Sequence, residues 1–238
     1  RFSQVTEPSY AAANNEKQRI NNELLPVRSR MAWIGNAIAE QEKQMRAWKD
    51  EKDPVPERSK ASKNYREQLA SAGLAAEPFY SCIDFRSDLA EEKRNAIESA
   101  LMETGFLDAL LSEGLLELEG DRQLLPNPQF FTQTLADYLV PDSSERSVDA
   151  GYVQDILQSI EVIDGGESDS SAPIISEDGS YRLFSLRGKA DNDYQASYIG
   201  KASRERFRIE KIRSLEAEIA RLQAELQSAA EEENGLLA

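Results

Sequence analysis

Two Gly-Lys pairs, Gly188-Lys189 and Gly200-Lys201, are the parts of the sequence that most resemble a phosphate-binding site. A phosphate-binding loop requires a further glycine five residues before the pair and a Ser or Thr after it that binds magnesium. Leu183 and Gln195 occupy the upstream positions, and alanine follows each lysine. The sequence therefore excludes a nucleotide-binding loop of this type at both pairs.

Histidine and cysteine, the usual zinc ligands and the commonest general base and nucleophile, are almost absent. The chain has no histidine and one cysteine, Cys82, which excludes His-based triads, ordinary zinc sites and an intrachain disulfide. Cys82 lies in the apolar run Phe79–Phe85, so we expect it to be a buried small hydrophobic residue. The stretch Asp191–Asp193 lacks the later glycine and glutamate of a calcium loop. We therefore expect no catalytic residue, cofactor or metal ion in this segment.

A group of cations is spaced so that its members would lie on one face of a helix. Such a stripe can neutralise DNA phosphates in a sequence-independent, salt-sensitive contact. The alternative is a solvated helix face whose charge is balanced by Glu205 and Glu210. The net charge of −15 argues against tight DNA binding by the segment as a whole. The possible DNA contacts are Lys201, Arg204, Arg208 and Lys211.

The composition narrows the class of protein further. Of the 238 residues, 30% are charged and 40% hydrophobic, which is typical of a chain that is partly long charged helix. No run of about 18 apolar residues occurs, so no membrane span is predicted. The single cysteine and the lack of a signal sequence favour a cytoplasmic protein. The first residue is not methionine and the last residues keep a helical pattern, so we expect a segment of a longer protein.

A heptad pattern organises the amino-terminal part of the chain. Apolar residues recur there at alternating spacings of four and three, interrupted only by Gln41. A seam of about two apolar residues in seven is typical of a coiled coil. Pro26 should kink this helix, but the seam keeps its phase across it, so we predict one bent helix. The seam residues are Ile20, Leu24, Val27, Met31, Ile34, Ile38, Met45 and Trp48.

A second heptad seam lies near the other end of the chain and consists of Ile212, Leu215, Ile219, Leu222 and Leu226. An arm of about 40 residues is roughly 60 Å long, too long to be buried by a compact domain of this size. Each arm therefore needs a partner of similar length. We predict that the arms pair with each other in antiparallel orientation, with Trp48 near Ser203–Phe207 and Ile20 near the carboxyl end.

The residues between the arms mix short strand and helix patterns, which predicts an α+β fold. The expected architecture is a small globular α+β module at the tip of an intramolecular antiparallel two-helix coiled coil. We place the N-terminal arm at 9–50, a linker at 51–76, the module at 77–195 and the C-terminal arm at 196–234. Within the linker we expect a short amphipathic helix at about Lys63–Ser71, closed by Gly73.

Local signals predict the elements of the module. Asp178-Gly179 is a strong signal for a β-hairpin turn, and Gly105 is well placed to end a helix that Ser87 or Asp88 can cap. The predicted elements are strands at Phe79–Phe85, Glu161–Ile163, Ile174-Ile175 and Tyr181–Leu186, and helices at Leu89–Thr104, Gln129–Leu139 and Val148–Ile160.

Several short phrases of the module and its flanks resemble one family of proteins. They are spread over about Trp48–Arg213. The phrases are Trp48 with Asp53-Pro54-Val55-Pro56, Pro78-Phe79-Tyr80 with Asp84-Phe85, Gly105-Phe106-Leu107-Asp108-Ala109, Asp178-Gly179, Leu186-Arg187-Gly188 and Tyr198-Ile199-Gly200-Lys201-Ala202.

In these phrases the chain resembles SMC-like ATPases, in particular the JetC family of large subunits in Wadjet plasmid-defence systems, which is related to the MukB and MksB families. The resemblance implies a hinge that joins two chains as a homodimer, without catalysis of its own. ATP and Mg²⁺ would bind only at a head domain outside this segment. The implied partners are kleisin, winged-helix and Toprim nuclease subunits and plasmid DNA, in a nucleoid- or plasmid-associated complex that extrudes DNA loops.

Two other functions fit the same sequence. A coiled-coil adaptor would bind a different protein through its tip and would not self-associate. A weak, non-specific DNA-contacting module would use the cation stripe described above.

Overall fold

The computed structural model describes residues 3–50, 54–142, 147–164 and 168–237. The chain divides into two compact units. The coil unit combines Arg1–Lys52 with Arg208–Ala238, and the module comprises Asp53–Phe207.

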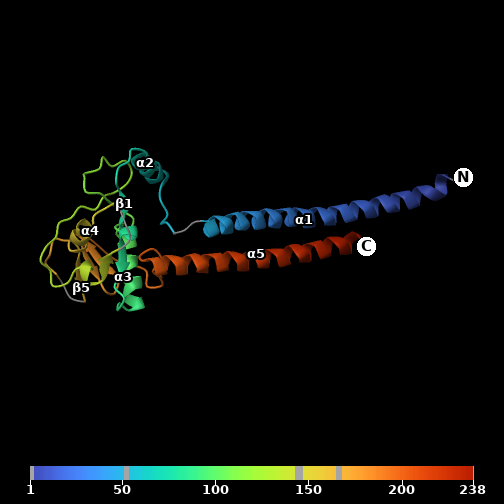
Figure 1. The fold of residues 1–238 in the computed structure, drawn as a ribbon. Helices are drawn as coiled ribbons and strands as arrows, with labels where there is room; N and C mark the ends of the chain where they lie inside the picture. Colours follow the sequence, from blue (N-terminus) through green and yellow to red (C-terminus); the bar gives the residue numbers. More distant parts are fainter. Residues whose placement is uncertain (1–2, 51–53, 143–146, 165–167, 238) are drawn as a thin grey trace. The chain divides into compact units, whose positions relative to one another are not determined.

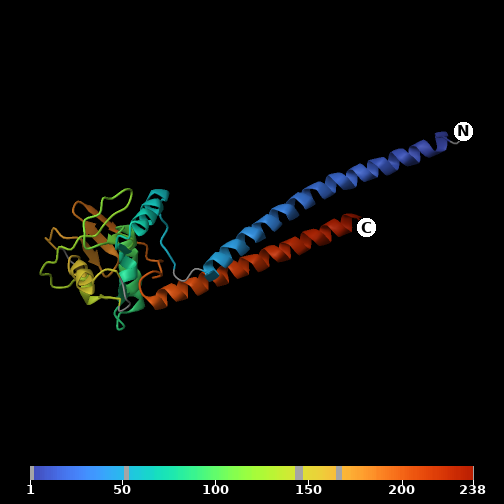
Figure 2. The ribbon, with the colours of Figure 1, turned by 45° about the horizontal axis from the view of Figure 1, so that its top comes forward.

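Two helices supply the coil unit: α1 (Ser3–Asp50) and the part of α5 (Lys201–Leu237) that begins at Arg208. The helix α1 passes through Pro26 as one element, which confirms a single helix. Figures 1 and 2 both show α1 and α5 side by side, with the two chain ends at the same end of the pair. Ion pairs join Arg28 to Glu233 and Lys49 to Glu216, so the helices are antiparallel.

The buried side chains of the coil unit belong to the two heptad seams. Leu25 and Trp33, which lie beside the first seam, are 69% and 65% exposed, so burial is confined to one face of α1. The seam residues Leu24, Val27, Ile34, Leu215, Ile219 and Leu222 are buried, and Ile20, Met31, Ile38, Met45, Trp48, Ile212 and Leu226 are half-buried. The predicted proximity of Trp48 to Ser203–Phe207 joins residues of the two units and stays a prediction.

In the described part of the module the strands form small sheets. The strand β1 (Glu77–Pro78) pairs with β3 (Leu110–Leu111), and β2 (Ile83–Phe85) pairs with β4 (Leu139–Pro141), both antiparallel. The largest sheet has the order β5-β6-β7-β8, in which only β5 and β6 are parallel. Its strands are β5 (Glu161–Ile163), β6 (Ile174–Ser176), β7 (Ser180–Leu183) and β8 (Leu186–Lys189).

One face of the four-stranded sheet covers the core of the module. Val162, Ile175 and Tyr181 are successive cross-strand partners. Val162 and Ile175 belong to the core cluster with Ile97 and Leu101 of α3 (Glu91–Glu103), and the partly buried Tyr181 packs against it. Because side chains alternate along a strand, the opposite face carries the neighbouring partners Glu161, Ile174, Arg182 and Arg187. The helix α4 (Ala150–Leu157) closes the core beside β4, and the Asp149 carboxylate caps its first turn.

Several local predictions are confirmed. The turn at Asp178-Gly179 joins β6 to β7, and Gly179 adopts a positive φ of 82°. Gly105, with a φ of 74°, follows the last turn of α3, and its N–H donates to the Met102 carbonyl. The helix predicted at Val148–Ile160 is α4, and the strand at Glu161–Ile163 is β5. Cys82 is buried, as expected.

Three other predictions are wrong. Phe79–Cys82 forms a 3₁₀ helix, and only Ile83–Phe85 is a strand; a continuous apolar run shows burial but not its period. The segment Gln129–Leu139 is not an α-helix, because Thr134 caps a single 3₁₀ turn at Leu135–Asp137 before β4 begins. Ala90, and neither Ser87 nor Asp88, occupies the cap position of α3.

The segment predicted as a linker, 51–76, contains α2 (Lys60–Ser71). Ser59 caps this helix by accepting a hydrogen bond from the Ser62 N–H at 3.1 Å. Residues 51–53 lie outside the described part of the chain. From residue 54 onward the segment belongs to the module, because α2 is bonded to the loops after α3.

Candidate interaction surfaces

A buried carboxylate fixes the loop from which α5 begins. Glu98, fully buried in α3, accepts hydrogen bonds from the backbone N–H groups of Ser197, Tyr198 and Ile199 at 2.6, 3.0 and 2.8 Å. The Tyr194 hydroxyl donates a fourth bond at 2.8 Å. Burial raises the pKa of Glu98, and these donors partly offset that effect. We call residues 194–200 the anchor loop.

Other contacts hold the anchor loop in the same place. Asn95, one turn before Glu98, accepts from the Ala196 N–H at 2.9 Å. Gly200 has a φ of 79°, and a Cβ there would lie 2.1 Å from the Asp84 carboxylate, so this position requires glycine. Arg206 donates to the Ala196 carbonyl at 3.2 Å. The first turns of α5 are therefore part of the module and are oriented by α3.

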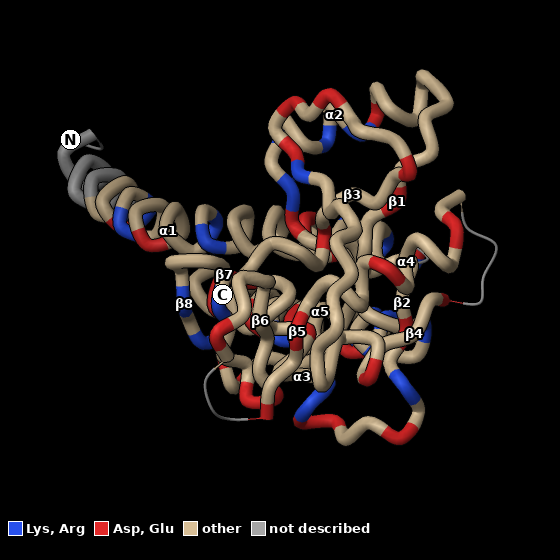
Figure 3. The backbone as a smooth tube through the Cα atoms, turned by 90° about the vertical axis from the view of Figure 1, so that its left-hand side faces the viewer, with Lys and Arg blue, Asp and Glu red and all other residues tan. Residues whose placement is uncertain are grey.

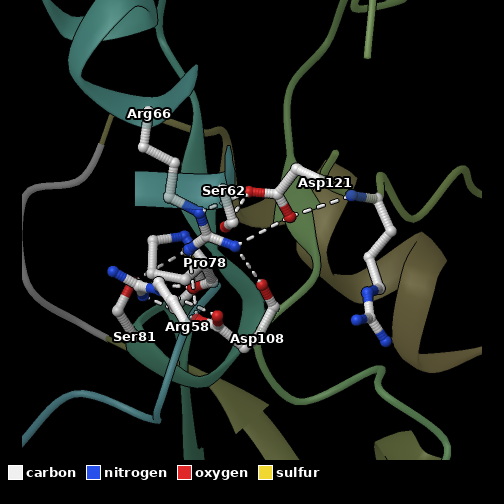
Figure 4. A network of polar contacts seen from close by, with 9 residues as sticks. Arg58, Ser62, Arg66, Pro78, Ser81, Asp108 and Asp121 are labelled. Atoms are coloured by element: carbon white, nitrogen blue, oxygen red, sulfur yellow. Dashed lines mark hydrogen bonds and ion pairs between the residues drawn. The ribbon is translucent and has the colours of Figure 1, made fainter. Parts of the chain in front are cut away.

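A cluster of arginines and aspartates ties α2 to the loops that follow α3 (Figure 4). Arg58 makes a bidentate pair with Asp108, at 2.8 and 2.6 Å. Arg66 contacts both Asp108 and Asp121, and the Ser62 hydroxyl donates to Asp121 at 2.6 Å. Such paired, charge-assisted bonds are stronger than neutral ones. Burial acts to raise the pKa of Asp121, but the bonds from Arg66 and Ser62 outweigh it and lower that pKa.

The turn between β7 and β8 presents an exposed aromatic residue. Phe184 adopts a φ of 51°, and in the described chain it is the single non-glycine residue with positive φ. A bulky side chain in this region is an outlier, because its Cβ crowds the backbone. Phe184 is nevertheless 80% exposed, and Leu186 beside it is 58% exposed. Neither burial nor local geometry in the single chain explains a phenylalanine here.

A groove of about 500 Å³ lies between α2 and the loop after β3. We call it the α2 groove. Leu74 and Leu115, on its two sides, are 53% and 83% exposed. Among the described residues its charged lining is acidic, and the lining includes Leu69, Leu74, Glu113, Leu115, Leu116 and Glu117.

The predicted cation stripe is divided between the two units. Lys201 and Lys211 are exposed and Arg208 is half-buried. Arg204 is 4% exposed, and one of its Nη atoms donates to the Tyr198 carbonyl at 3.0 Å. Arg204 therefore supports the anchor loop and presents little charge for DNA. A DNA contact at Lys201, Arg208 and Lys211 stays a prediction.

The Gly-Lys pairs have structural explanations. Gly200-Lys201 forms the start of α5, and Gly188-Lys189 lies in β8, where Tyr181 packs so closely that a Cβ on Gly188 would be 2.4 Å from its hydroxyl. Within the described ranges, no group of three or more Asp, Glu or Cys side chains is placed to hold a metal ion.

Sequence reasoning missed three features of the module: the Glu98 site, the Arg58–Asp108 pair and Phe184. The first two join residues far apart in the chain, so no local spacing marks them. Phe184 contradicts the residue preference of its own turn.

Comparisons with known proteins give a limited set of similarities. No family model and no curated protein matches the sequence. The chain is similar to the Pyrococcus furiosus Smc hinge domain with an extended coiled coil, at 14% identity and a TM-score of 0.35, over 95% of this chain and 94% of that one. It is also similar to the Geobacillus stearothermophilus SMC hinge domain, solved as an asymmetric dimer, at 10% identity and a TM-score of 0.40, over 91% and 98%. None of the described helices is long and apolar enough to cross a membrane.

Proposed function

We propose that this segment is the hinge of an SMC-like ATPase, a non-catalytic module through which two copies of the chain associate. The observation that carries the proposal is the insertion of an α+β module between two helices that pair in antiparallel orientation. Ion pairs such as Arg28–Glu233 and Lys49–Glu216 link these helices within one chain. Each helix covers the apolar seam of the other within one chain, so α1 and α5 are not needed for contact between chains.

The module keeps large apolar side chains on its surface, which is where a hinge would bind its second copy. Contiguous exposed apolar residues on a folded domain mark interaction sites. Phe184 and Leu186 lie on the β7–β8 hairpin, and Leu74 and Leu115 lie along the α2 groove. These surfaces are available for association after the module has formed its own core.

The proposed ATPase complex also needs a head domain and partner subunits that are not part of this segment. We propose that ATP and Mg²⁺ bind at a distant head domain, and that the full protein belongs to the JetC family of Wadjet plasmid defence. Kleisin, winged-helix and Toprim nuclease subunits and plasmid DNA would be its partners, and it would work in the cytoplasm with the nucleoid or plasmid. The phrases around Gly105–Ala109 and Tyr198–Ala202 support this narrower assignment.

Light scattering coupled to size-exclusion chromatography tests the association. A dimer mass at tens of micromolar, falling to the monomer mass on dilution, is the expected result. A monomer at every concentration would refute the hinge proposal and favour the adaptor, which binds a different protein through its tip.

The DNA-contacting alternative has its own test. If the cation stripe binds DNA, the combined replacement of Lys201, Arg208 and Lys211 by Glu abolishes a salt-sensitive gel shift with a plasmid fragment. An unchanged gel shift would exclude these three residues as the DNA-binding site.

A further inference from the structure

We propose that the β7–β8 hairpin of one copy inserts into the α2 groove of a second copy, and that the exchange is reciprocal. This inference rests on the proposed hinge function and names the surfaces that would carry out the association. The module has two surfaces that the single chain does not explain: one combines exposed apolar residues with a basic residue, and the other combines an apolar lining with acidic residues.

The hairpin has the properties of an inserted element. Phe184 holds a positive φ of 51° while its ring is 80% exposed. Backbone strain of this kind persists where the surrounding structure or a function requires it. Leu186 adds a second exposed apolar side chain. Arg187 follows on β8 and is exposed, so the hairpin offers an apolar tip beside a basic residue. Lys189, further along β8, is paired with Asp178 at 2.9 Å.

The α2 groove has the matching properties. Its volume of about 500 Å³ and its leucine lining, Leu69, Leu74 and Leu115, suit an aromatic side chain. Glu113 and Glu117 line it, and no Lys or Arg is among its described lining residues. Charge complementarity therefore favours an apolar and basic occupant, and the hairpin is such an element of this same chain.

The occupant must come from a second copy. In Figure 3, β8 and α2 lie at different edges of the module, so one chain cannot place its own hairpin in its own groove. Two copies related by a twofold axis can each give a hairpin and receive one. The paired contacts double the buried area, which helps to reach the roughly 1,600 Å² of a stable interface.

Direct pairing of two β8 edges is the competing arrangement. The strand β8 lies at the edge of its sheet and could accept another strand. Antiparallel self-pairing of β8 centred on Arg187 would place the Arg187 side chains of the two copies opposite each other. Like charges placed opposite each other are destabilising, so β8 is better suited to an acidic surface than to its own copy.

A charge-reversal experiment on the full chain tests the contact. Glu117→Lys and Arg187→Glu should each raise the dimer dissociation constant about tenfold or more, measured by sedimentation equilibrium. The double variant should return to within about threefold of the native value, because the reversed charges again attract. Glu103→Lys, an exposed reversal on α3, is the control and should leave the constant unchanged.

Phe184→Gly provides a second measurement. It should weaken the dimer about tenfold or more, while circular dichroism and thermal unfolding of the monomer show that the module remains folded.

The outcomes separate this inference from the hinge proposal. A native dimer that neither Glu117→Lys nor Arg187→Glu weakens would overturn the hairpin-and-groove contact and leave the hinge in place. A double variant no tighter than the single ones would also overturn the direct contact. A native chain that is monomeric at tens of micromolar would overturn both.

Discussion

The Glu98 carboxylate accepts a hydrogen bond of 2.8 Å from the backbone N–H of Ile199, a residue 101 positions later in the chain. This bond joins the middle of α3 to the loop from which α5 begins. Together with the bonds from Ser197 and Tyr198, it fixes the start of α5 to α3 within the module.

Glu98→Ala should destabilise the module by about 2–4 kcal/mol, because it leaves the buried N–H groups of Ser197, Tyr198 and Ile199 without an acceptor. Urea unfolding measures the loss. Hydrogen exchange should show faster exchange at these amides than in the native chain. Glu92→Ala, an exposed change on the same helix, should cost less than about 0.5 kcal/mol. Equal losses for the two variants would show that Glu98 does not hold the anchor loop.

The bonds to Asp121 predict a pH dependence of stability. The pKa of Asp121 is lowered from its ordinary value of 3.8, so its contribution is present above that value and lost as the pH falls through the lowered pKa. Asp121→Asn should therefore cost about 1–3 kcal/mol at pH 7, and the difference from the native chain should shrink below about pH 4. Chemical unfolding at several pH values measures it.

Asp155→Asn, a change at an exposed carboxylate of α4, is the control for Asp121 and should show little difference at any pH. A loss for Asp121→Asn that stayed constant down to pH 2 would mean that the charge of Asp121 is not what stabilises α2.

The sequence predicts the structure best at positions where neighbouring residues alone determine the backbone conformation or the buried face. Gly105 and Asp178-Gly179 occupy positions that require a positive φ or a tight turn, and their residue types alone predict both. The heptad pattern identified the faces of α1 and α5. The prediction of one strand at Phe79–Phe85 is wrong because nearly the whole segment is buried, Ser81 included, so its polar residues do not reveal a period.

The polar sites could not be predicted in the same way. Glu98 resembles any other acidic residue of an exposed helix until the fold places Ser197–Ile199 against it. Arg58 and Asp108 are likewise brought together only by the folded module. A charged residue is identified as part of a buried site by its three-dimensional neighbours, and one sequence does not contain that information.

The alignment of the coil can be tested by crosslinking within one chain. Arg28→Cys combined with Glu233→Cys should react in high yield with a short bismaleimide, because the native side chains form an ion pair of 2.6 Å. Arg28→Cys combined with Glu216→Cys should not react, because Glu216 pairs with Lys49 at the other end. Cys82 is buried and contributes little background. Equal yields for both pairs would contradict the observed alignment.

Phe184→Gly should stabilise the isolated module even though it removes a large apolar side chain. Glycine adopts a φ of 51° without the steric cost that phenylalanine bears. Since the ring is 80% exposed, little burial is lost. Glycine also gives the unfolded chain more conformational freedom, which offsets part of this gain. The net free energy of unfolding should therefore rise by about 0.5–1 kcal/mol. Urea unfolding at a concentration where the chain is monomeric measures it, because dimerisation would add its own stabilisation.

Ser185→Gly, at the adjacent position where φ is negative, is the matched control and should lower stability by about 0.5 kcal/mol. A loss of stability on Phe184→Gly would mean that the ring supports the fold of its own chain, and the argument that it is exposed for a second copy would lose its basis.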